Sequence, residues 1–204
     1  MEYIQNYLSQ LQKTIDTLPK HLIVDVIAIL QQARIQANQV FIMGNGGSAS
    51  TASHFVCDLA KNTCRKGLPN FRVIGLTDNM ASFSAYANDE GYENVFSQQL
   101  MNLIKPGDVV IGISTSGNSK NVINAIEEAQ KHNVTTIGFT GFDGGRLGQI
   151  VNLNIHVKSN IIEHVEDIHL ILEHIIVKMI KEQAQPTANL TTPIAQLPVK
   201  VSAD

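Results

Sequence analysis

The stretch VFIMGNGGS, residues 40–48, joins four consecutive apolar residues to a glycine-rich turn. An apolar run of this length without alternation is typical of a strand that is buried on both faces of a sheet. Similar runs follow at residues 71–76, 109–113, 135–139 and 153–157. Helical spacing of apolar residues appears between and after them, at residues 48–60, 95–104, 119–132 and 163–182. This order predicts an α/β fold in which helices cover both faces of a five-stranded parallel sheet.

The two ends of the chain differ from this alternating middle part. Apolar residues from Ile4 to Leu18 recur at helical spacing, Pro19 interrupts them, and a second helical pattern runs to Ile35. We therefore expect a helical N-terminal extension at residues 1–37 and an α/β domain at residues 38–182. Residues 183–204 are rich in Pro, Thr and Ala, which predicts a tail that is weakly ordered unless a partner subunit holds it.

Composition and charge narrow the class of protein. The chain has 204 residues, of which 44% are hydrophobic and 16% charged, as in a globular domain with helical additions. A formal net charge of −3 gives no reason to expect a nucleic acid partner. No membrane span and no signal peptide are visible, so we expect a cytoplasmic protein. Cys57 and Cys64 could form a disulfide, but free thiols in a reducing cytosol fit them better.

Two of the predicted strands end in loops of unusual chemistry, at the sheet edge where ligands bind in open parallel folds. The first loop contains Asn45, Gly46, Gly47 and Ser48, and the second contains the hydroxyl residues Ser114, Thr115, Ser116 and Ser119. Each loop opens a helix, whose unpaired N–H groups and partial positive charge suit a phosphate. Ordinary turns with serine caps are the alternative, although a cap needs only one hydroxyl. Neither loop has a Walker or dinucleotide pattern, so a nucleotide is not predicted.

His54 and Asp58 lie four residues apart, near the start of the helix expected after the first loop. This spacing places both on one helix face, where an imidazole and a carboxylate suit zinc. An ordinary pair on a helix surface is the alternative.

The last predicted helix is strongly apolar, yet it carries a second set of polar residues: Glu166, Asp167, His169, Glu173 and His174. A buried charge needs a partner or a metal, whereas hydrogen bonds between subunits are the alternative explanation. Glu166 and His174 are eight residues apart, which is a rise of roughly 12 Å along a helix. Both reach one site only if it lies between them or if neighbouring subunits supply them separately.

These motifs resemble the phosphoheptose isomerases, a branch of the SIS domain family, over residues 3–182. The matching segments occur in the family's order and are residues 44–48, His54 with Asp58, Asn88 with Asp89, residues 114–119, residues 140–145 and residues 166–174. The hydroxyl-rich loop is typical of SIS domains in general. The spacing of His54 and Asp58, together with the acid and histidine of the last helix, points to the phosphoheptose branch.

The resemblance implies a flavodoxin-like three-layer sandwich, assembled as a homotetramer with active sites between subunits. It implies a small-molecule sugar phosphate as partner and an aldose–ketose isomerase as activity. The expected reaction converts sedoheptulose 7-phosphate to D-glycero-D-manno-heptose 7-phosphate, the first step toward heptose in lipopolysaccharide or capsule.

The resemblance also assigns residues. The substrate positions are Asn45, Gly46, Gly47, Ser48, Asn88, Asp89, Ser114, Thr115, Ser116, Ser119 and Glu166. The metal positions, for one zinc ion per site, are His54, Asp58, Glu166 and His174. From residue chemistry we expect Asp58 to be the base that transfers a proton and His174 to be the opposing acid, since imidazole titrates near neutral pH.

The chain departs from the family pattern at three positions. Asp58 and Glu166 stand where the family usually has Glu and Gln, and Glu163 stands where it usually has Asp. These departures suggest that the chain acts on a related substrate, or that the roles of catalytic base and metal ligand are distributed differently among these residues. The rival class is a non-catalytic SIS protein, such as the factor that binds the bacterial replication initiator, which needs no metal pair. A sugar-phosphate-sensing regulator is disfavoured because no helix-turn-helix segment precedes the SIS region.

Overall fold

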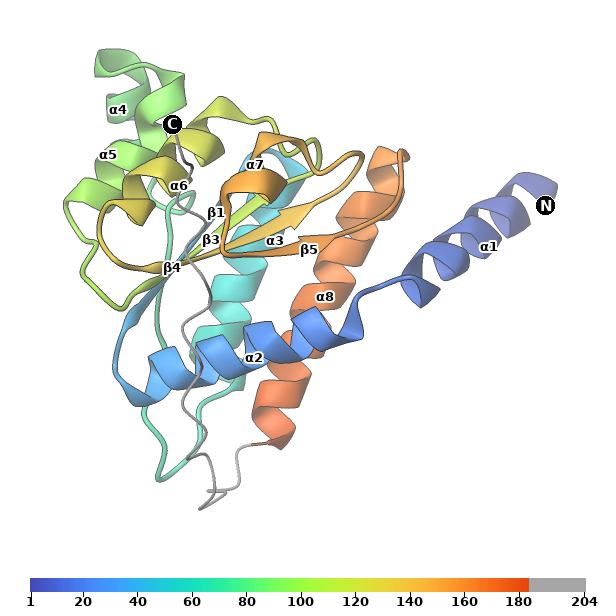
Figure 1. Ribbon diagram of the computed structural model, residues 1–204, viewed down its shortest axis with the longest axis horizontal. Helices are drawn as coiled ribbons and strands as arrows, with labels where there is room; N and C mark the ends of the chain where they lie inside the picture. The colour runs from blue at the N-terminus through green and yellow to red at the C-terminus, as the bar shows by residue number, and fades with distance from the viewer. Residues whose placement is uncertain (184–204) are drawn as a thin grey trace.

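The computed structural model describes residues 1–183 and has one five-stranded parallel sheet at its centre (Figure 1). The spatial order is β2-β1-β3-β4-β5, and every neighbouring pair is parallel. The strands are β1 (Gln39–Gly44), β2 (Arg72–Gly75), β3 (Val109–Ser114), β4 (Thr135–Thr140) and β5 (Leu153–His156). The predicted strands and their parallel arrangement are thus confirmed.

Helices cover both faces of the sheet, so the expected three-layer α/β sandwich is confirmed. One face is covered by α2 (Lys20–Ile35), α3 (Gly47–Cys57) and α8 (Ile162–Glu182). The other is covered by α4 (Met80–Asp89), α5 (Val95–Met101), α6 (Lys120–Gln130) and α7 (Gly145–Ile150). Two short turns complete the described elements, the π-helix η1 (Asp58–Asn62) and the 3-10 helix η2 (Tyr92–Asn94).

Strand β1 shows why the apolar runs form a doubly covered sheet. Val40 and Ile42 pack with residues of α2, α3 and α8, whereas Phe41 and Met43 pack with residues of α5 and α6. All four side chains have no exposed surface. Because successive side chains of a strand point to opposite faces, only a continuous apolar run can fill both cores.

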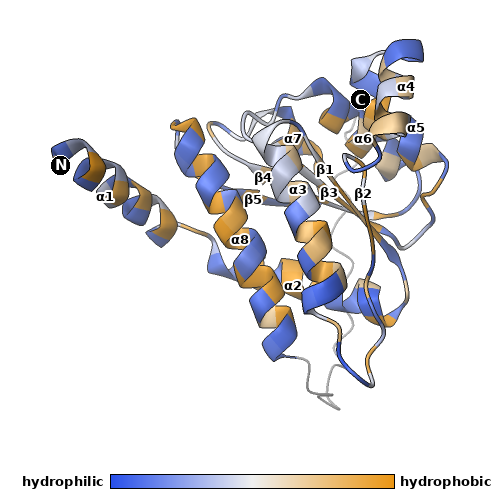
Figure 2. Cartoon of the chain, turned by 180° about the vertical axis from the view of Figure 1, so that it is seen from behind, coloured by the Kyte–Doolittle hydropathy of each residue, from blue (hydrophilic) through white to orange (hydrophobic). Residues whose placement is uncertain are grey.

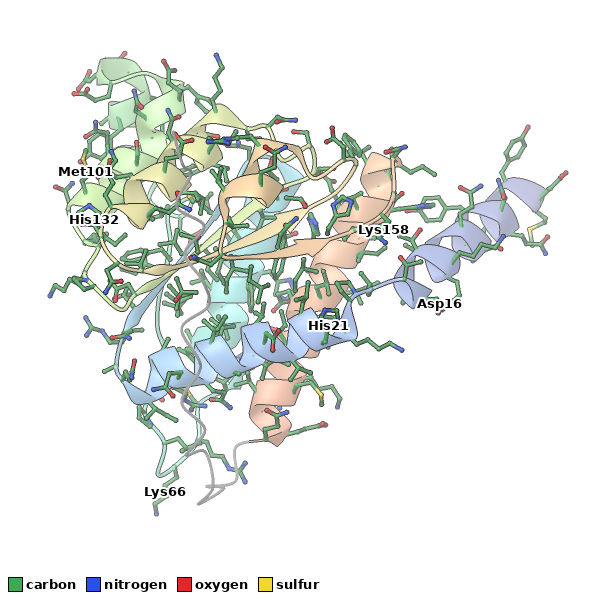
Figure 3. All side chains as sticks on the ribbon, viewed as in Figure 1. Asp16, His21, Lys66, Met101, His132 and Lys158 are labelled. Atoms are coloured by element: carbon green, nitrogen blue, oxygen red, sulfur yellow. The ribbon has the colours of Figure 1, made fainter. Side chains whose placement is uncertain are left out.

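The N-terminal region forms two helices that Pro19 separates, as predicted. Pro19 occupies the N-cap of α2, and α2 packs into the core beside α8 and β5. In contrast, α1 (Glu2–Asp16) extends away from the body of the molecule and contains no buried residue (Figure 1). Asp16, at its end, is exposed (Figure 3), whereas the Tyr7 hydroxyl donates to Asp167 of α8 at 2.6 Å, and Leu11 and Ile15 pack against the core.

Two of the helices have no counterpart in the sequence prediction. Helix α4 has only 10 residues and buries none of them fully, although Phe83, Tyr86 and Ala87 pack against the core at helical spacing. Helix α7 has only six residues, two of which are glycines. The predicted C-terminal tail lies almost wholly outside the described residues. Among residues 1–183, no helix combines the length and apolar content that a membrane crossing requires.

Candidate active site

The hydroxyl-rich loop connects β3 to α6 at the carboxyl edge of the sheet. The Ser114 and Ser119 hydroxyl oxygens lie 3.0 Å apart, and the Ser116 hydroxyl accepts a hydrogen bond of 3.2 Å from the Asn118 N–H. Ser119 is the N-cap residue of α6, but in the described part of the chain its side chain caps no backbone N–H. The serine-cap alternative therefore does not explain Ser119.

A second segment, residues 140–145, supports this loop from the neighbouring strand end. Gly141 donates its N–H to the Thr115 carbonyl at 2.9 Å. Gly117 has a φ of 65° and approaches Gly144 so closely that a Cβ atom would collide with the Gly144 carbonyl oxygen. Only glycine meets both requirements, so this position fixes the shape of the hydroxyl loop.

A cavity of about 200 Å³ lies between the two strand-end loops and the start of α8. Its lining is Asn45, Ser48, Ile113, Ser114, Thr115, Ser116, Ser119, Phe142, Ile162 and Glu166. Seven of these residues are positions that the sequence assigned to the substrate. The structure therefore brings together the polar side chains of both loops and one carboxylate of the last helix.

Glu166 reaches this cavity from α8 and lies against the first residue of α3. A Cβ atom placed on Gly47 would lie 2.7 Å from one carboxylate oxygen of Glu166. The position is electrostatically favourable, because the positive end of the α3 dipole faces the carboxylate. The glycine at residue 47 makes this approach of the two helices sterically feasible.

The Asn45 side chain is held in a network of hydrogen bonds. Its amide nitrogen donates to the Asn121 side-chain oxygen at 2.8 Å, and Asn121 donates back at 2.9 Å. The Tyr92 hydroxyl also donates to the Asn45 oxygen at 2.9 Å. Asn121 is almost fully buried, so this network holds the Asn45 side chain in one orientation at the edge of the cavity.

A second group of polar side chains, all potential metal ligands, lies farther along α3 and α8, which run side by side (Figure 2). His54, Asp58, Glu173 and His174 each offer one potential ligand atom, and these four atoms lie within 4.8 Å of one another. Nε2 of His54 is 3.7 Å from Asp58, and Nε2 of His174 is 3.3 Å from Glu173. The two imidazole rings meet edge to face at 5.0 Å.

The most unusual member of the cluster is Glu173. Its side chain has no exposed surface, and within residues 1–183 neither carboxylate oxygen has a hydrogen-bond partner. Burial, reinforced by the nearby Asp58 carboxylate, raises the pKa of Glu173 to about 8. A divalent cation would balance the negative charge of the ionised Glu173 carboxylate and bind its oxygen atoms. The two carboxylates and two imidazoles therefore fit a metal such as zinc.

The expected position of His54 and Asp58 near the start of their helix is wrong. His54 lies in the last turn of α3, and Asp58 opens the π-helix η1. The predicted helix at residues 48–60 starts one residue after α3 begins, but α3 is only 11 residues long and ends at Cys57. A π-turn at Asp58 is consistent with a functional role, since such turns occur often at functional sites.

The structure does not bring all of the predicted site residues together. Asn88 and Asp89 end α4, where they are exposed and hydrogen-bonded to each other at 2.7 Å. Glu166 lines the cavity and is not part of the four-residue cluster, whereas Glu173 is part of it. Sequence reasoning noted Glu173 as a charge in an apolar helix but did not assign it to the metal set.

Comparison with known proteins places these features in a family context. The model of the SIS domain matches residues 2–141. A probable phosphoheptose isomerase from Thermoplasma acidophilum is 41% identical over 161 residues, which are 79% of this chain and 88% of that protein. A phosphoheptose isomerase from Geotalea daltonii is 37% identical over 188 residues, or 90% of this chain and 96% of that protein.

A solved structure gives the same result at the level of the fold. The phosphoheptose isomerase GmhA from Neisseria gonorrhoeae superimposes with a TM-score of 0.81 and 28% sequence identity. The superposition covers 89% of this chain and 98% of that one.

Proposed function

The chain belongs to the phosphoheptose isomerases of the SIS domain family, and from this premise we propose that it interconverts sedoheptulose 7-phosphate and D-glycero-D-manno-heptose 7-phosphate. The observation that carries the proposal is the pairing of a hydroxyl-lined cavity with a cluster of acids and imidazoles on the same two helices. The cavity suits a phosphate, and the cluster suits proton transfer at a carbonyl.

The phosphate is held by the loop between β3 and α6. The Ser116 and Ser119 hydroxyls and the start of α6 face the cavity without a cationic side chain in its lining. Hydroxyl and backbone N–H donors at a helix N-terminus bind phosphate by hydrogen bonds and by the helix dipole. Such a site accepts the charged end of a sugar and leaves its other end free to extend along α3 and α8.

The distance between cavity and cluster fits an extended sugar. Glu166 in the cavity and Glu173 in the cluster are seven residues apart on α8, which is a rise of about 10 Å. A phosphate bound at the hydroxyl loop therefore directs the opposite end of a long-chain sugar toward His54, Asp58 and His174. A short ketose phosphate leaves part of this interval empty.

The reaction needs a proton to move between two neighbouring carbon atoms. A base takes the proton from C1 of the ketose and returns it to C2, while a proton passes from O1 to O2 through an enediol. We assign the carbon-bound proton to Asp58 and the oxygen-bound proton to His174, because they face one site from two helices. The imidazole suits this task, because a neutral ring has one nitrogen that donates a hydrogen bond and one that accepts.

The cofactor we propose is one zinc ion per site. His54, Asp58 and His174 are within reach of a common ion, and a fourth ligand comes from α8. When bound, the ion polarises the carbonyl group and stabilises the negative charge of the enediolate.

The same proposal includes a homotetramer in the cytoplasm that supplies heptose for lipopolysaccharide or capsule. Apolar side chains on α1 and at the start of α8 support the assembly: Tyr3 is 91% exposed, Ile4 60%, Leu8 57% and Ile162 48%. A helix that buries none of its own residues gains stability when a second copy covers its apolar side. The N-terminal helices and α8 are therefore the proposed subunit contacts.

A coupled assay with sedoheptulose 7-phosphate, run beside shorter ketose phosphates, tests the function. We expect turnover of the seven-carbon substrate to exceed turnover of the shorter sugars. Elemental analysis of the same preparation measures bound zinc. Absence of both turnover and metal contradicts the isomerase and favours the non-catalytic SIS binding protein.

A further inference from the structure

Glu173 and Glu166 both lie on α8, yet their surroundings differ in a way that the family pattern does not anticipate. That pattern gives a metal-ligand role to residue 166, where relatives usually have Gln. In this chain the carboxylate at residue 166 lines the substrate cavity, and a second carboxylate at residue 173 lies in the cluster. We propose that Glu173 replaces residue 166 as the fourth metal ligand, and that Glu166 contacts the substrate instead.

Helix geometry carries the first step of this inference. The ligand atoms of Glu173 and His174 come from adjacent residues and lie 3.3 Å apart. Glu166 is separated from His174 by eight residues, a rise of roughly 12 Å. Within one subunit, a single ion in contact with His54, Asp58 and His174 is therefore far closer to Glu173 than to Glu166.

The position of Glu166 carries the second step. Its carboxylate lies against Gly47 at the N-terminus of α3, on the side of the hydroxyl loop. His54 and Asp58 lie at the opposite end of α3. To bind an ion beside them, Glu166 would have to leave the favourable end of the helix dipole.

The burial of Glu173 carries the third step. A carboxylate with no exposed surface and no hydrogen-bond partner within residues 1–183 is costly unless a cation accompanies it. The groups that face it are Asp58, which repels it, and the imidazoles of His54 and His174. A divalent ion balances the two carboxylates, and its two oxygen and two nitrogen ligands match a tetrahedral zinc site.

The two acids of α8 then have separate roles, one at the metal and one at the substrate. Glu173 holds the ion, and Glu166 supplies a carboxylate that accepts hydrogen bonds from sugar hydroxyls in the cavity. This inference rests on the proposed zinc site but not on the identity of the sugar. Metal binding can therefore be measured in the absence of substrate.

The test is the affinity of the full-length, metal-stripped protein for Zn²⁺, measured by competition with a chromophoric chelator. The variants are Glu173→Gln and Glu166→Ala, with Glu163→Ala as matched control, since Glu163 is an exposed acid on the same helix. We expect Glu173→Gln to weaken Zn²⁺ binding by about tenfold or more. The other two variants should remain within about threefold of the wild type, since neither removes a ligand.

Two further measurements separate a ligand from a merely buried acid. Thermal unfolding with and without Zn²⁺ should show that the metal raises the Tm of the wild type far more than that of Glu173→Gln. The absorption spectrum of the Co²⁺-loaded protein should change in Glu173→Gln and stay unchanged in Glu166→Ala. If Glu173→Gln fails to fold, Glu173→Asp, which keeps the charge but shortens the side chain, should still bind Zn²⁺ more weakly than the wild type.

The inference is overturned if Glu166→Ala loses the metal and Glu173→Gln keeps it. Equal Zn²⁺ affinity of wild type and Glu173→Gln also overturns it, while sugar turnover by the wild type would leave the isomerase function intact. A wild type that binds neither Zn²⁺ nor Co²⁺ removes the metal from both proposals.

Discussion

The carboxylate of Glu166 lies against the α-carbon of Gly47, so that a Cβ atom on residue 47 would be 2.7 Å from its Oε2 atom. The contact joins the glycine-rich loop after β1 to the last helix of the chain. This contact is possible because glycine has no Cβ atom, and any larger residue at position 47 would displace the Glu166 carboxylate. The cavity therefore depends on a glycine whose φ is not in the left-handed region.

This relationship predicts the effect of Gly47→Ala. Alanine favours a helix over glycine by roughly 0.8–1.0 kcal/mol, so the Tm should not fall. The methyl group should push Glu166 away and lower kcat/KM by about tenfold or more, as expected when a polar contact to the substrate is lost. Ser50→Ala, at an exposed position of α3, is the control and should retain normal kinetics. A Gly47→Ala enzyme with wild-type kcat/KM contradicts the proposed contact of Glu166 with the sugar.

The hydroxyl loop predicts a loss of phosphate affinity in the double variant Ser116→Ala/Ser119→Ala. Each hydrogen bond to a charged group contributes roughly 1.5–3 kcal/mol, so binding should weaken by at least about tenfold. Titration calorimetry with inorganic phosphate and with the sugar phosphate measures the change. Ser84→Ala, in the exposed helix α4, is the matched control. Unchanged affinity of the double variant would remove the loop from the phosphate site.

The Asn45 network predicts a smaller effect from Tyr92→Phe. This change removes the hydroxyl that donates to the Asn45 oxygen and leaves the pairing with Asn121 in place. A net hydrogen bond is worth about 0.5–1.5 kcal/mol, so KM should rise roughly two- to tenfold with little change in kcat. Tyr86→Phe removes a tyrosine hydroxyl that accepts from Asn102 and serves as control. If both variants change KM equally, the Asn45 network has no special role.

Asp58 and His54 should differ in what their replacement removes. His54→Ala should lose metal and activity together, because it deletes a neutral nitrogen ligand. Asp58→Asn should lower kcat by a factor of about 10² or more, the usual scale for a general base. Its oligomeric state and phosphate affinity should survive, as light scattering and calorimetry can show. Near-normal turnover in both Asp58→Asn and His174→Ala would refute the assigned acid–base pair.

The sequence predicts the sheet and the last helix well, but it does not predict α4 and α7. Runs such as residues 109–113 identify β3 because a strand covered on both faces must be apolar throughout. The hydroxyl loop is equally visible, since it follows such a strand directly. Helix α4 escapes prediction because its apolar stripe, Phe83 with Tyr86 and Ala87, spans little more than one turn, too short for a clear helical period.

The choice between Glu166 and Glu173 lies beyond what spacing can decide. Both are acids in one apolar helix, and the resemblance to the family favours residue 166. The deciding facts are three-dimensional. The carboxylate of Glu166 lies against Gly47. Glu173 is fully buried, and one of its oxygens lies within 4.8 Å of the other ligand atoms of the cluster. Helix spacing alone gives only the warning that residues 166 and 174 share a site if it lies between them or if neighbouring subunits supply them separately.

His169 provides a prediction about pH that is independent of substrate. Its imidazole is buried beside Phe139, and the only bond it makes among the described residues is one of 3.4 Å to the Thr140 carbonyl. Burial lowers the pKa of His169 to about 4, so the folded protein keeps it neutral. In the unfolded chain the pKa is about 6.5. The unfolded state therefore binds more protons than the folded state between pH 6.5 and pH 4.

The sign follows directly from proton linkage. Stability rises with pH wherever the unfolded state binds more protons, so His169 lowers the free energy of unfolding as the pH falls from 6.5 toward 4. The size is about 2 kcal/mol at pH 5 for each subunit. Glu173 has the opposite effect. Because its pKa is raised to about 8, the folded state binds more protons than the unfolded state, and the free energy of unfolding rises as the pH falls from 8 toward 4.5. The two contributions partly cancel in the metal-free wild type.

The experiment must therefore remove the carboxylate before it tests the imidazole. Two proteins are compared with chelator present, Glu173→Gln and the double variant Glu173→Gln/His169→Leu. Between pH 7 and pH 5 the free energy of unfolding of the single variant should fall by about 2 kcal/mol more than that of the double variant. Urea unfolding at each pH gives the free energy of unfolding. The comparison uses the change of this free energy with pH, so a constant cost of packing leucine cancels. His21→Gln, at an exposed position of α2, should keep the full pH dependence. If His169→Leu leaves the slope unchanged, the imidazole is not neutral in the folded protein, and the acid sensitivity must come from other groups.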